Sequence, residues 1–185
     1  MISRKAVLSI IMLSVVGLIL TACAQRQVRY LKNNIHTVRS HRGELKASYT
    51  NWVKPRGGHR IIPVNTPIVI GRWRRGFTFV TQDNRQRVLF EYNQRNMPYS
   101  IREYINLISS PQPVSPQAFS DIDQKGIHKG SAFKGMSKEG VLVALGYPAA
   151  HQTPSLDDDV WIYWRDRMWR MKVTFDVDGK VISIR

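Results

Sequence analysis

The chain has 185 residues, enough for one or two small domains, and it contains no internal repeat and no long low-complexity tract. Its 28 Lys and Arg residues outnumber its 13 Asp and Glu residues, which gives a formal net charge of +15. Its partners are therefore expected to be anionic. The single cysteine excludes a disulfide within the chain.

The first residues have the pattern of an export signal. Arg4 and Lys5 precede an apolar run over residues 6–20, and small residues follow it. The run has about 15 residues, fewer than the roughly 20 that a helix needs to cross a bilayer core. We therefore interpret the run as part of a signal peptide rather than as a transmembrane helix.

The run ends in Leu20-Thr21-Ala22-Cys23, which resembles the lipobox of bacterial lipoproteins. The resemblance implies that residues 1–22 are removed and that Cys23 carries fatty acyl chains such as palmitate, more than one of which is needed for stable anchoring. A plain secretory signal would instead leave Cys23 as an unpaired thiol in an oxidising compartment. Acylation would also exclude Cys23 as a nucleophile or a metal ligand.

Ala24 follows the lipidated position and implies export to the outer membrane, where the chain would face the periplasm. Loss of Arg4 and Lys5 with the signal lowers the formal net charge from +15 to +13. Export argues against nucleic acid as a partner. Anionic phospholipid headgroups, lipopolysaccharide phosphates, peptidoglycan carboxylates and acidic protein faces are the candidates; a basic surface that serves only solubility is the alternative.

Residues 23–46 are polar and basic without a clean helical or alternating pattern, and we interpret them as a basic tether. Val28, Tyr30 and Leu31 allow one short strand within it. Short β-rich runs separated by turn residues follow over residues 49–92, a pattern typical of a small antiparallel barrel.

The barrel is expected to end in a helix. Ser100 is a predicted N-cap, and apolar residues follow at helical spacing: Ile101, Tyr104, Ile105 and Ile108. Residues 47–110 are thus predicted to form a β domain, similar to an SH3-like barrel, with a C-terminal helix. The proline-rich residues 111–116 are predicted to form a stiff linker and the domain boundary.

The remaining chain, residues 117–185, has a helix signal followed by three strand signals. Ser137 is expected to cap a helix that Gly146 and Pro148 end. Strands are predicted at residues 160–164, 168–175 and 181–184, with a two-residue turn at Asp178-Gly179.

Several short segments of this region carry a family resemblance. Residues 135–139, 141–148, 161–163, 173–175 and 178–181 are similar, in order and spacing, to the SmpA/OmlA (BamE-like) outer-membrane lipoprotein family. The resemblance covers residues 120–185 and implies two helices packed on a three-stranded antiparallel sheet, with the first helix near residues 117–125. The predicted fold class is therefore α+β, an SH3-like barrel followed by a BamE-like domain. The β-rich domain and the loop over residues 149–159 have no counterpart in the family.

Catalytic and metal-binding patterns are not found. The five histidines are scattered, and Asp157-Asp158-Asp159 is interpreted as a solvated loop rather than a cation site. We expect no enzymatic activity, no metal and no cofactor.

Arginines are adjacent to aromatic residues in two places, and both places are candidate binding sites. Guanidinium groups bind phosphate through paired hydrogen bonds, and indole rings pack at membrane interfaces or against sugar rings. The candidate ligand- or partner-binding residues are Arg72, Trp73, Arg74, Arg75, Trp161, Tyr163, Trp164, Arg165 and Arg167. Trp169 accompanies the second group, in which Trp161 and Tyr163 should lie on the opposite strand face from Trp164. The alternative is that the tryptophans fill the core and the arginines face water.

The sequence thus predicts an outer-membrane-anchored periplasmic lipoprotein that acts as a non-enzymatic adaptor or scaffold in envelope or outer-membrane protein assembly. Barrel-assembly components and other envelope proteins are the expected partners. An envelope-ligand module for peptidoglycan or anionic lipid is the alternative. Inhibition of a periplasmic enzyme follows only from fold analogy.

Overall fold

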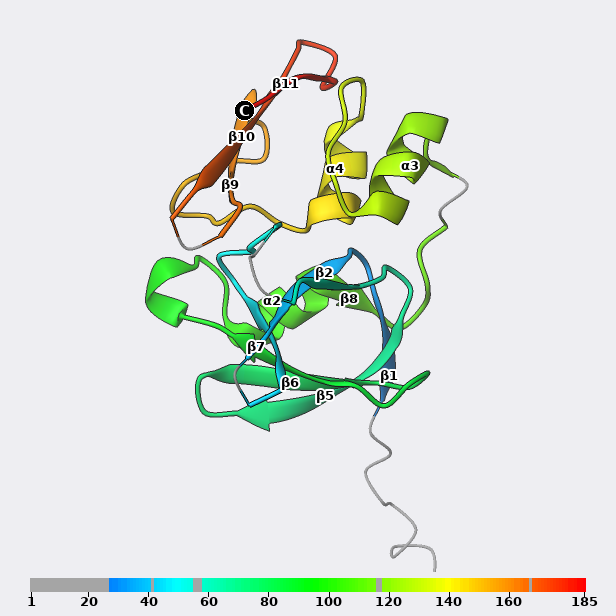
Figure 1. Ribbon diagram of the computed structural model, residues 1–185, viewed down its shortest axis with the longest axis vertical. Helices are drawn as coiled ribbons and strands as arrows, with labels where there is room; N and C mark the ends of the chain where they lie inside the picture. Colours follow the sequence, from blue (N-terminus) through cyan, green and yellow to red (C-terminus); the bar gives the residue numbers. More distant parts are fainter. Residues whose placement is uncertain (1–26, 41, 55–57, 116–117, 167) are drawn as a thin grey trace, which may run out of the picture.

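The computed structural model describes residues 27–40, 42–54, 58–115, 118–166 and 168–185. It has two parts stacked on each other (Figure 1): a curled sheet below, and a smaller sheet with two helices above. The α+β fold class is confirmed.

Eight strands of the described residues form the lower sheet, in the order β4-β2-β3-β7-β6-β5-β1-β8. The strands are β1 (Val28–Leu31), β2 (Ile35–Arg39), β3 (Leu45–Ser48), β4 (Arg60–Ile62), β5 (Pro67–Trp73), β6 (Gly76–Thr81), β7 (Arg87–Glu91) and β8 (Ser109–Ser110). The predicted all-antiparallel pairing is wrong at one place, because β3 and β7 pair in parallel. A parallel pair needs a long crossover, and here β4, β5 and β6 supply it.

The expectation of a tether is wrong for residues 27–46, because they contribute β1, β2 and β3. The short strand expected around Val28, Tyr30 and Leu31 is confirmed, and it lies between β5 and β8. Leu31 is fully buried there. These strands have four or five residues each, too few for a local alternation to stand out, and their partners are distant in sequence.

Helix α2 (Ile101–Ile108) packs on the curled sheet and begins at Ser100, as predicted. The Ser100 hydroxyl accepts from the main-chain N–H of Glu103, and the Glu103 carboxylate accepts from that of Ser100. This capping box satisfies two N–H groups that a helix start leaves unpaired. Tyr104 and Ile108 of α2 are buried in a core that includes the stacked rings of Phe77 and Phe90.

The segment predicted to be a linker stays close to the curled sheet. The side chain of Asn65 both donates to the carbonyl oxygen of Val114 and accepts from its N–H, at 2.9 and 2.8 Å. Residues 116–117 lie outside the described residues.

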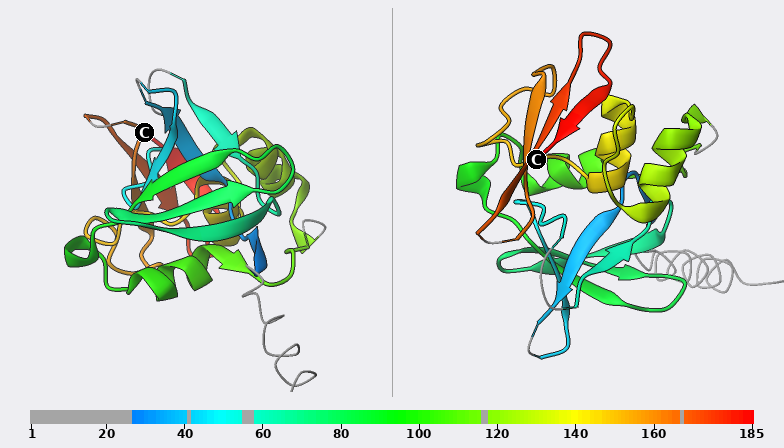
Figure 2. Two further views of the ribbon diagram at one scale, coloured as in Figure 1. Left: turned by 90° about the horizontal axis from the view of Figure 1, so that it is seen from below. Right: turned by 45° about the horizontal axis from the view of Figure 1, so that its top comes forward.

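The upper part contains α3 (Asp121–Lys129) and α4 (Lys138–Leu145) on one face of a three-stranded antiparallel sheet, with β9 (Val160–Trp164), β10 (Arg170–Phe175) and β11 (Val181–Ile184) in the order β11-β10-β9. Figure 2 shows the helices beside this sheet and above the lower one. The predicted cap at Ser137 and the helix end at Gly146 are confirmed. Helix α3 starts four residues later than the family resemblance implied, because Ser120 provides its cap.

Hydrogen bonds join the two parts at the C-terminal ends of α3 and α4. The amide of Asn34, just before β2, donates to the carbonyl oxygens of Ile127 in α3 and Ala144 in α4. The amide of Asn51 donates to the carbonyl oxygens of Leu145 and Tyr147. Since the last carbonyls of a helix have no partner within the helix, the lower part supplies the missing donors. The predicted domain boundary therefore separates two parts that pack as one body.

Candidate functional site

The outer face of the curled sheet carries a groove of about 620 Å³. Its floor contains a valine row, formed by Val28 of β1, Val69 of β5 and Val80 of β6, which the strand register places side by side. The same register puts Arg87 of β7 directly beyond Val80. Four neighbouring strands thus present three apolar side chains and then a guanidinium group.

Two further arginines line this groove, and we call Arg72, Arg85 and Arg87 the groove arginines. All three side chains are exposed, and they enter no hydrogen bond or ion pair with other described residues. No carboxylate lines the groove. The groove arginines therefore hold a positive charge that no carboxylate in the groove compensates, in the same groove as the valine row.

Gly71 deepens the groove beside Arg72. It pairs with Thr78 of β6, and a Cβ at Gly71 would lie 2.6 Å from the Thr78 hydroxyl oxygen. A larger residue would therefore displace the Thr78 side chain and fill this part of the floor.

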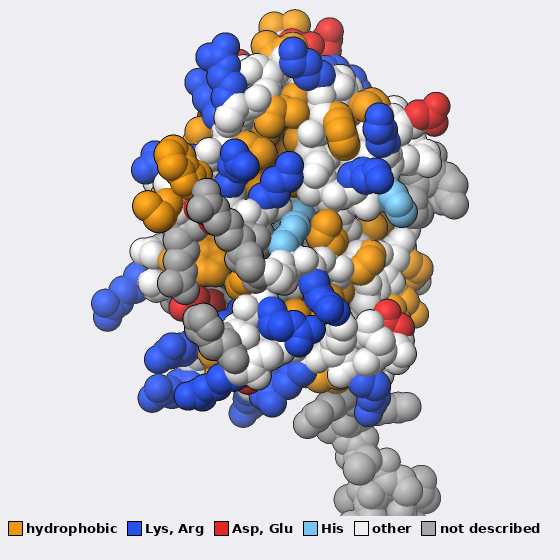
Figure 3. All heavy atoms as spheres, in the orientation of Figure 1, with side chains coloured by type: hydrophobic (Ala, Val, Ile, Leu, Met, Phe, Trp, Pro, Cys, Tyr) orange, Lys and Arg blue, Asp and Glu red, His pale blue; other side chains and the backbone are white. Residues whose placement is uncertain are grey.

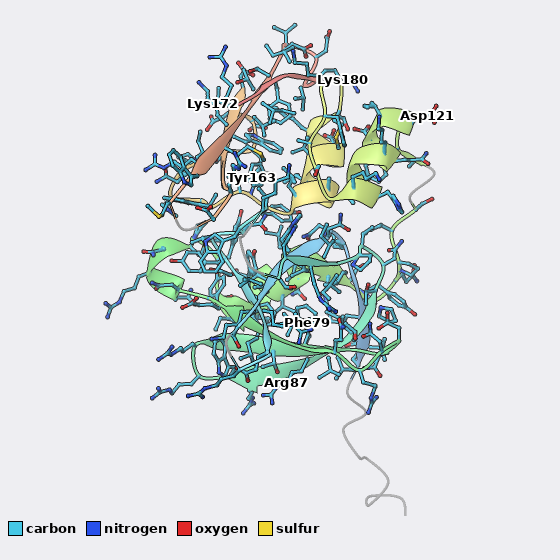
Figure 4. All side chains as sticks on the ribbon, viewed as in Figure 1. Phe79, Arg87, Asp121, Tyr163, Lys172 and Lys180 are labelled. Carbon is cyan, nitrogen blue, oxygen red and sulfur yellow. The ribbon has the colours of Figure 1, made fainter. Side chains whose placement is uncertain are left out.

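A second hollow of about 340 Å³ adjoins the groove at Arg87 and is lined also by Arg39, Arg42 and Glu44. Figure 3 shows Lys and Arg side chains gathered along the lower end of the molecule, and Figure 4 labels Arg87 there, below Phe79 of the core. The chain enters the sheet at this same end, at Val28.

The first predicted binding group lies on the hairpin between β5 and β6. Arg72 and Trp73 end β5, and Arg74 and Arg75 form the turn, with all three arginines exposed and Trp73 half-buried. Only Arg72 lines the groove. Arg85, Arg87 and Val28 were missed, because register across four strands brings them together and no local motif marks them.

The residues of the second predicted group lie on both faces of the upper sheet, as the alternation of side chains along a strand implied. Trp161 and Tyr163 are fully buried against the helices, so their selection as surface contacts is wrong and the core alternative holds for them. The Tyr163 hydroxyl donates to the carbonyl oxygen of Gly146. Burial raises the pKa of Tyr163 well above its usual value, which keeps this donor protonated.

Trp164 lies on the other sheet face, half-buried beneath the guanidinium of Arg170, 5.1 Å from its ring centroid. Arg165 is exposed. Arg167 and Cys23 lie outside the described residues, so their predicted roles stay predictions.

The turn between β9 and β10 exposes two large apolar side chains: Trp169, which was predicted to accompany the second binding group, and Met168, which was not. Met168 is 82% exposed and Trp169 is 59% exposed. The carboxylate of Asp166 accepts from the main-chain N–H groups of both residues. A thioether and an indole are therefore presented to solvent between Arg165 and Arg170 in the chain.

A pair of histidines, the buried His36 and the half-buried His59, lies at the junction of the two parts. His36 Nε2 lies 3.0 Å from the carbonyl oxygen of Ala144, and His36 Nδ1 lies 3.0 Å from Nε2 of His59. Burial lowers the pKa of His36 to about 4, and it lowers the pKa of His59 as well. The neutral His36 ring therefore donates from Nε2 and accepts at Nδ1.

Within the described residues, no group of three or more His, Cys, Asp or Glu side chains is arranged to hold a metal ion. No helix in that part of the chain is long and apolar enough to span a membrane. Comparison with protein-family models, with curated proteins and with solved structures finds no match to the chain.

Proposed function

We propose that the chain is an outer-membrane-anchored periplasmic lipoprotein that acts as a non-enzymatic adaptor or scaffold in envelope or outer-membrane protein assembly. The lipobox resemblance at Cys23 supports the anchor. The curled sheet and the two-helix, three-stranded upper part support an SH3-like barrel followed by a BamE-like domain as the finer fold assignment.

The observation that carries the adaptor role is the exposure of Met168 and Trp169 at the β9–β10 turn. Aromatic residues and methionine are enriched where proteins bind proteins, and arginine often accompanies them. Leaving both side chains in water has a free-energy cost that a partner surface would remove. The two hydrogen bonds to Asp166 restrain the main chain at Met168 and Trp169, which lowers the conformational entropy lost on binding.

The experiment places a photo-crosslinking amino acid at Met168 in the full chain in cells. The expected result is a crosslink to one or a few proteins of defined mass, with barrel-assembly components as the specific expectation. Trp169→Ala in the same chain should weaken this crosslink strongly. The matched control carries the crosslinker at Val177, which is 99% exposed at another turn.

Two results would contradict the adaptor role. One is a crosslink to lipid or peptidoglycan alone, and the other is the same protein pattern from Val177 as from Met168.

A second candidate function, an envelope-ligand module for peptidoglycan or anionic lipid, is favoured by the uncompensated charge of the groove arginines.

A further inference from the structure

We infer that the groove on the curled sheet binds the headgroup phosphate of an anionic phospholipid from the same bilayer that holds the acyl chains of Cys23. The groove arginines would contact the phosphate, and the valine row would contact the glycerol and the first methylenes of the lipid. This inference rests on the proposed membrane anchor, and it assigns a ligand to a face that the adaptor role does not use.

The charge of the groove favours an anionic ligand. Guanidinium groups bind phosphate oxygens through paired N–H donors, and the groove arginines have no such acceptor among the described residues. Each basic residue close to an anionic membrane strengthens binding about fivefold. Three of them at one groove would therefore bias the orientation of the whole molecule.

The valine row distinguishes a lipid from a free anion. Inorganic phosphate would leave the valine row in water, whereas a phospholipid places carbon next to its phosphate and so covers both kinds of surface. A volume of about 620 Å³ lies in the usual range for small-ligand sites, roughly 300–1,000 Å³, which suits a headgroup with its glycerol.

The position of the groove on the chain supports the same source. Val28 of the valine row is the fifth residue after Cys23, and five residues span at most about 18 Å when extended. A chain anchored at Cys23 therefore keeps the groove within reach of the headgroup layer. With the groove against the bilayer, the upper sheet, which lies at the other end of the molecule (Figure 1), would point away from the membrane.

The test uses the acylated full chain with Gln82→Cys, which lines the groove and carries an environment-sensitive fluorophore. Cys23 is the only cysteine of the chain, so acylation leaves the new thiol as the single labelling site. The labelled protein is placed in nanodiscs of phosphatidylcholine, with or without phosphatidylglycerol. The expected result is a blue shift of the emission with phosphatidylglycerol, and its loss at high salt.

The variants Arg72→Glu and Arg87→Glu should each raise the phosphatidylglycerol fraction for the half-maximal shift about fivefold or more. Arg87→Gln removes the positive charge without reversing it, and its effect on the half-maximal fraction should be smaller. Val80→Phe should reduce the shift without changing the charge, because it fills the floor. Lys172→Glu is the matched control, since Lys172 is exposed on the upper sheet, away from the groove (Figure 4), and should leave the shift unchanged.

Equal emission in both kinds of nanodisc, or an unchanged shift in Arg87→Glu, would overturn the inference. A full shift from inorganic phosphate added to phosphatidylcholine nanodiscs would also overturn it, because the site would then need no lipid. Failure to enter phosphatidylcholine nanodiscs, together with labelling at two thiols, would refute the anchor instead. In that case the emission shift is measured after phosphatidylglycerol vesicles are added to the soluble protein. This measurement tests lipid binding at the groove independently of the anchor.

Discussion

His36 Nε2 of β2 lies 3.0 Å from the carbonyl oxygen of Ala144 in the last turn of α4. The two residues belong to different parts of the molecule, and the contact exists only when those parts are packed together. A neutral imidazole donates its Nε2 proton here, while its other nitrogen accepts from His59. The histidine thus helps to cap a helix end beside Asn34, which binds the same carbonyl oxygen.

The free energy of unfolding should fall as the pH falls from about 6.5 toward about 4. Burial lowers the pKa of His36 from 6.5 to about 4, so the unfolded chain binds the proton first and is favoured in this window. The full effect of this shift is about 3 kcal/mol, present as stability above pH 6.5 and lost near pH 4. Urea unfolding at half-unit pH steps measures it.

His36→Gln should flatten this pH dependence, because the Gln amide donates to the same carbonyl and does not titrate. His59, whose pKa burial and Lys54 also lower, contributes in the same window, and His59→Asn separates its share. A stability curve for the double variant His36→Gln/His59→Asn that still falls as steeply as that of the unchanged protein between pH 6.5 and 5 would contradict this assignment.

Asn34→Asp should destabilise the protein by about 3 kcal/mol or more at pH 7. The change removes the N–H donors from the carbonyls of Ile127 and Ala144 and brings a negative charge to two helix C-termini, where the dipoles oppose it. The exposed Asn96, whose amide contacts the Tyr49 hydroxyl, is the control, and Asn96→Asp should change stability by less than about 0.5 kcal/mol. Similar thermal unfolding midpoints for both variants would refute the capping role.

Asp123 holds the start of α4 against the first turn of α3, and Asp123→Ala should cost about 2–4 kcal/mol of folding stability. Its carboxylate, which is 3% exposed, accepts from the main-chain N–H and hydroxyl of Ser137 and from the hydroxyl of Ser120. Removal leaves the N–H and hydroxyl of the half-buried Ser137 without their acceptor, whereas the exposed Ser120 can bond to water. Asp121→Ala is the matched control, because Asp121 is exposed in the same first turn and its loss removes only a dipole interaction below about 1 kcal/mol. Chemical denaturation that ranks the two variants equally would contradict this role.

Cys23→Ala should abolish incorporation of labelled palmitate and release the chain from the outer-membrane fraction. The expectation follows from the lipobox resemblance, in which Cys23 is the acylated residue. Metabolic labelling and membrane fractionation measure the two effects, with Ala24→Ser as a neighbouring substitution that keeps the thiol. Unchanged membrane attachment of Cys23→Ala would refute the anchor.

Local signals in the sequence were sufficient to predict the helices and strands whose ends are marked by capping or turn residues. Ser100, Ser137 and Gly146 mark helix ends, and Asp178-Gly179 marks a hairpin, so α2, α4 and the upper sheet were predicted close to their observed bounds. Strands β2 and β3 were missed because their polar residues mask a short alternation, and pairing with β4 and β7 stabilises them.

The groove shows the same limit of sequence reasoning. Arg72 was selected because tryptophan and other arginines are its neighbours in the chain. Arg85 and Arg87 follow a turn with no such neighbours, and they join Arg72 only through the pairing of β5, β6 and β7. Burial of Trp161 and Tyr163 likewise depends on which sheet face the helices cover, and the alternation of the strand leaves that choice open.

The placement of β1 between β5 and β8 also has a mechanical consequence. Any tension on the chain from its start is transmitted first to the hydrogen bonds of β1. Through β1, those bonds join residues 67–69 to residues 109–110, which are far apart in sequence. Force applied at the beginning of the chain therefore acts on the pairing that joins β8 to the rest of the sheet. Detachment of β1 would separate β8 from β5 and expose two unpaired strand edges.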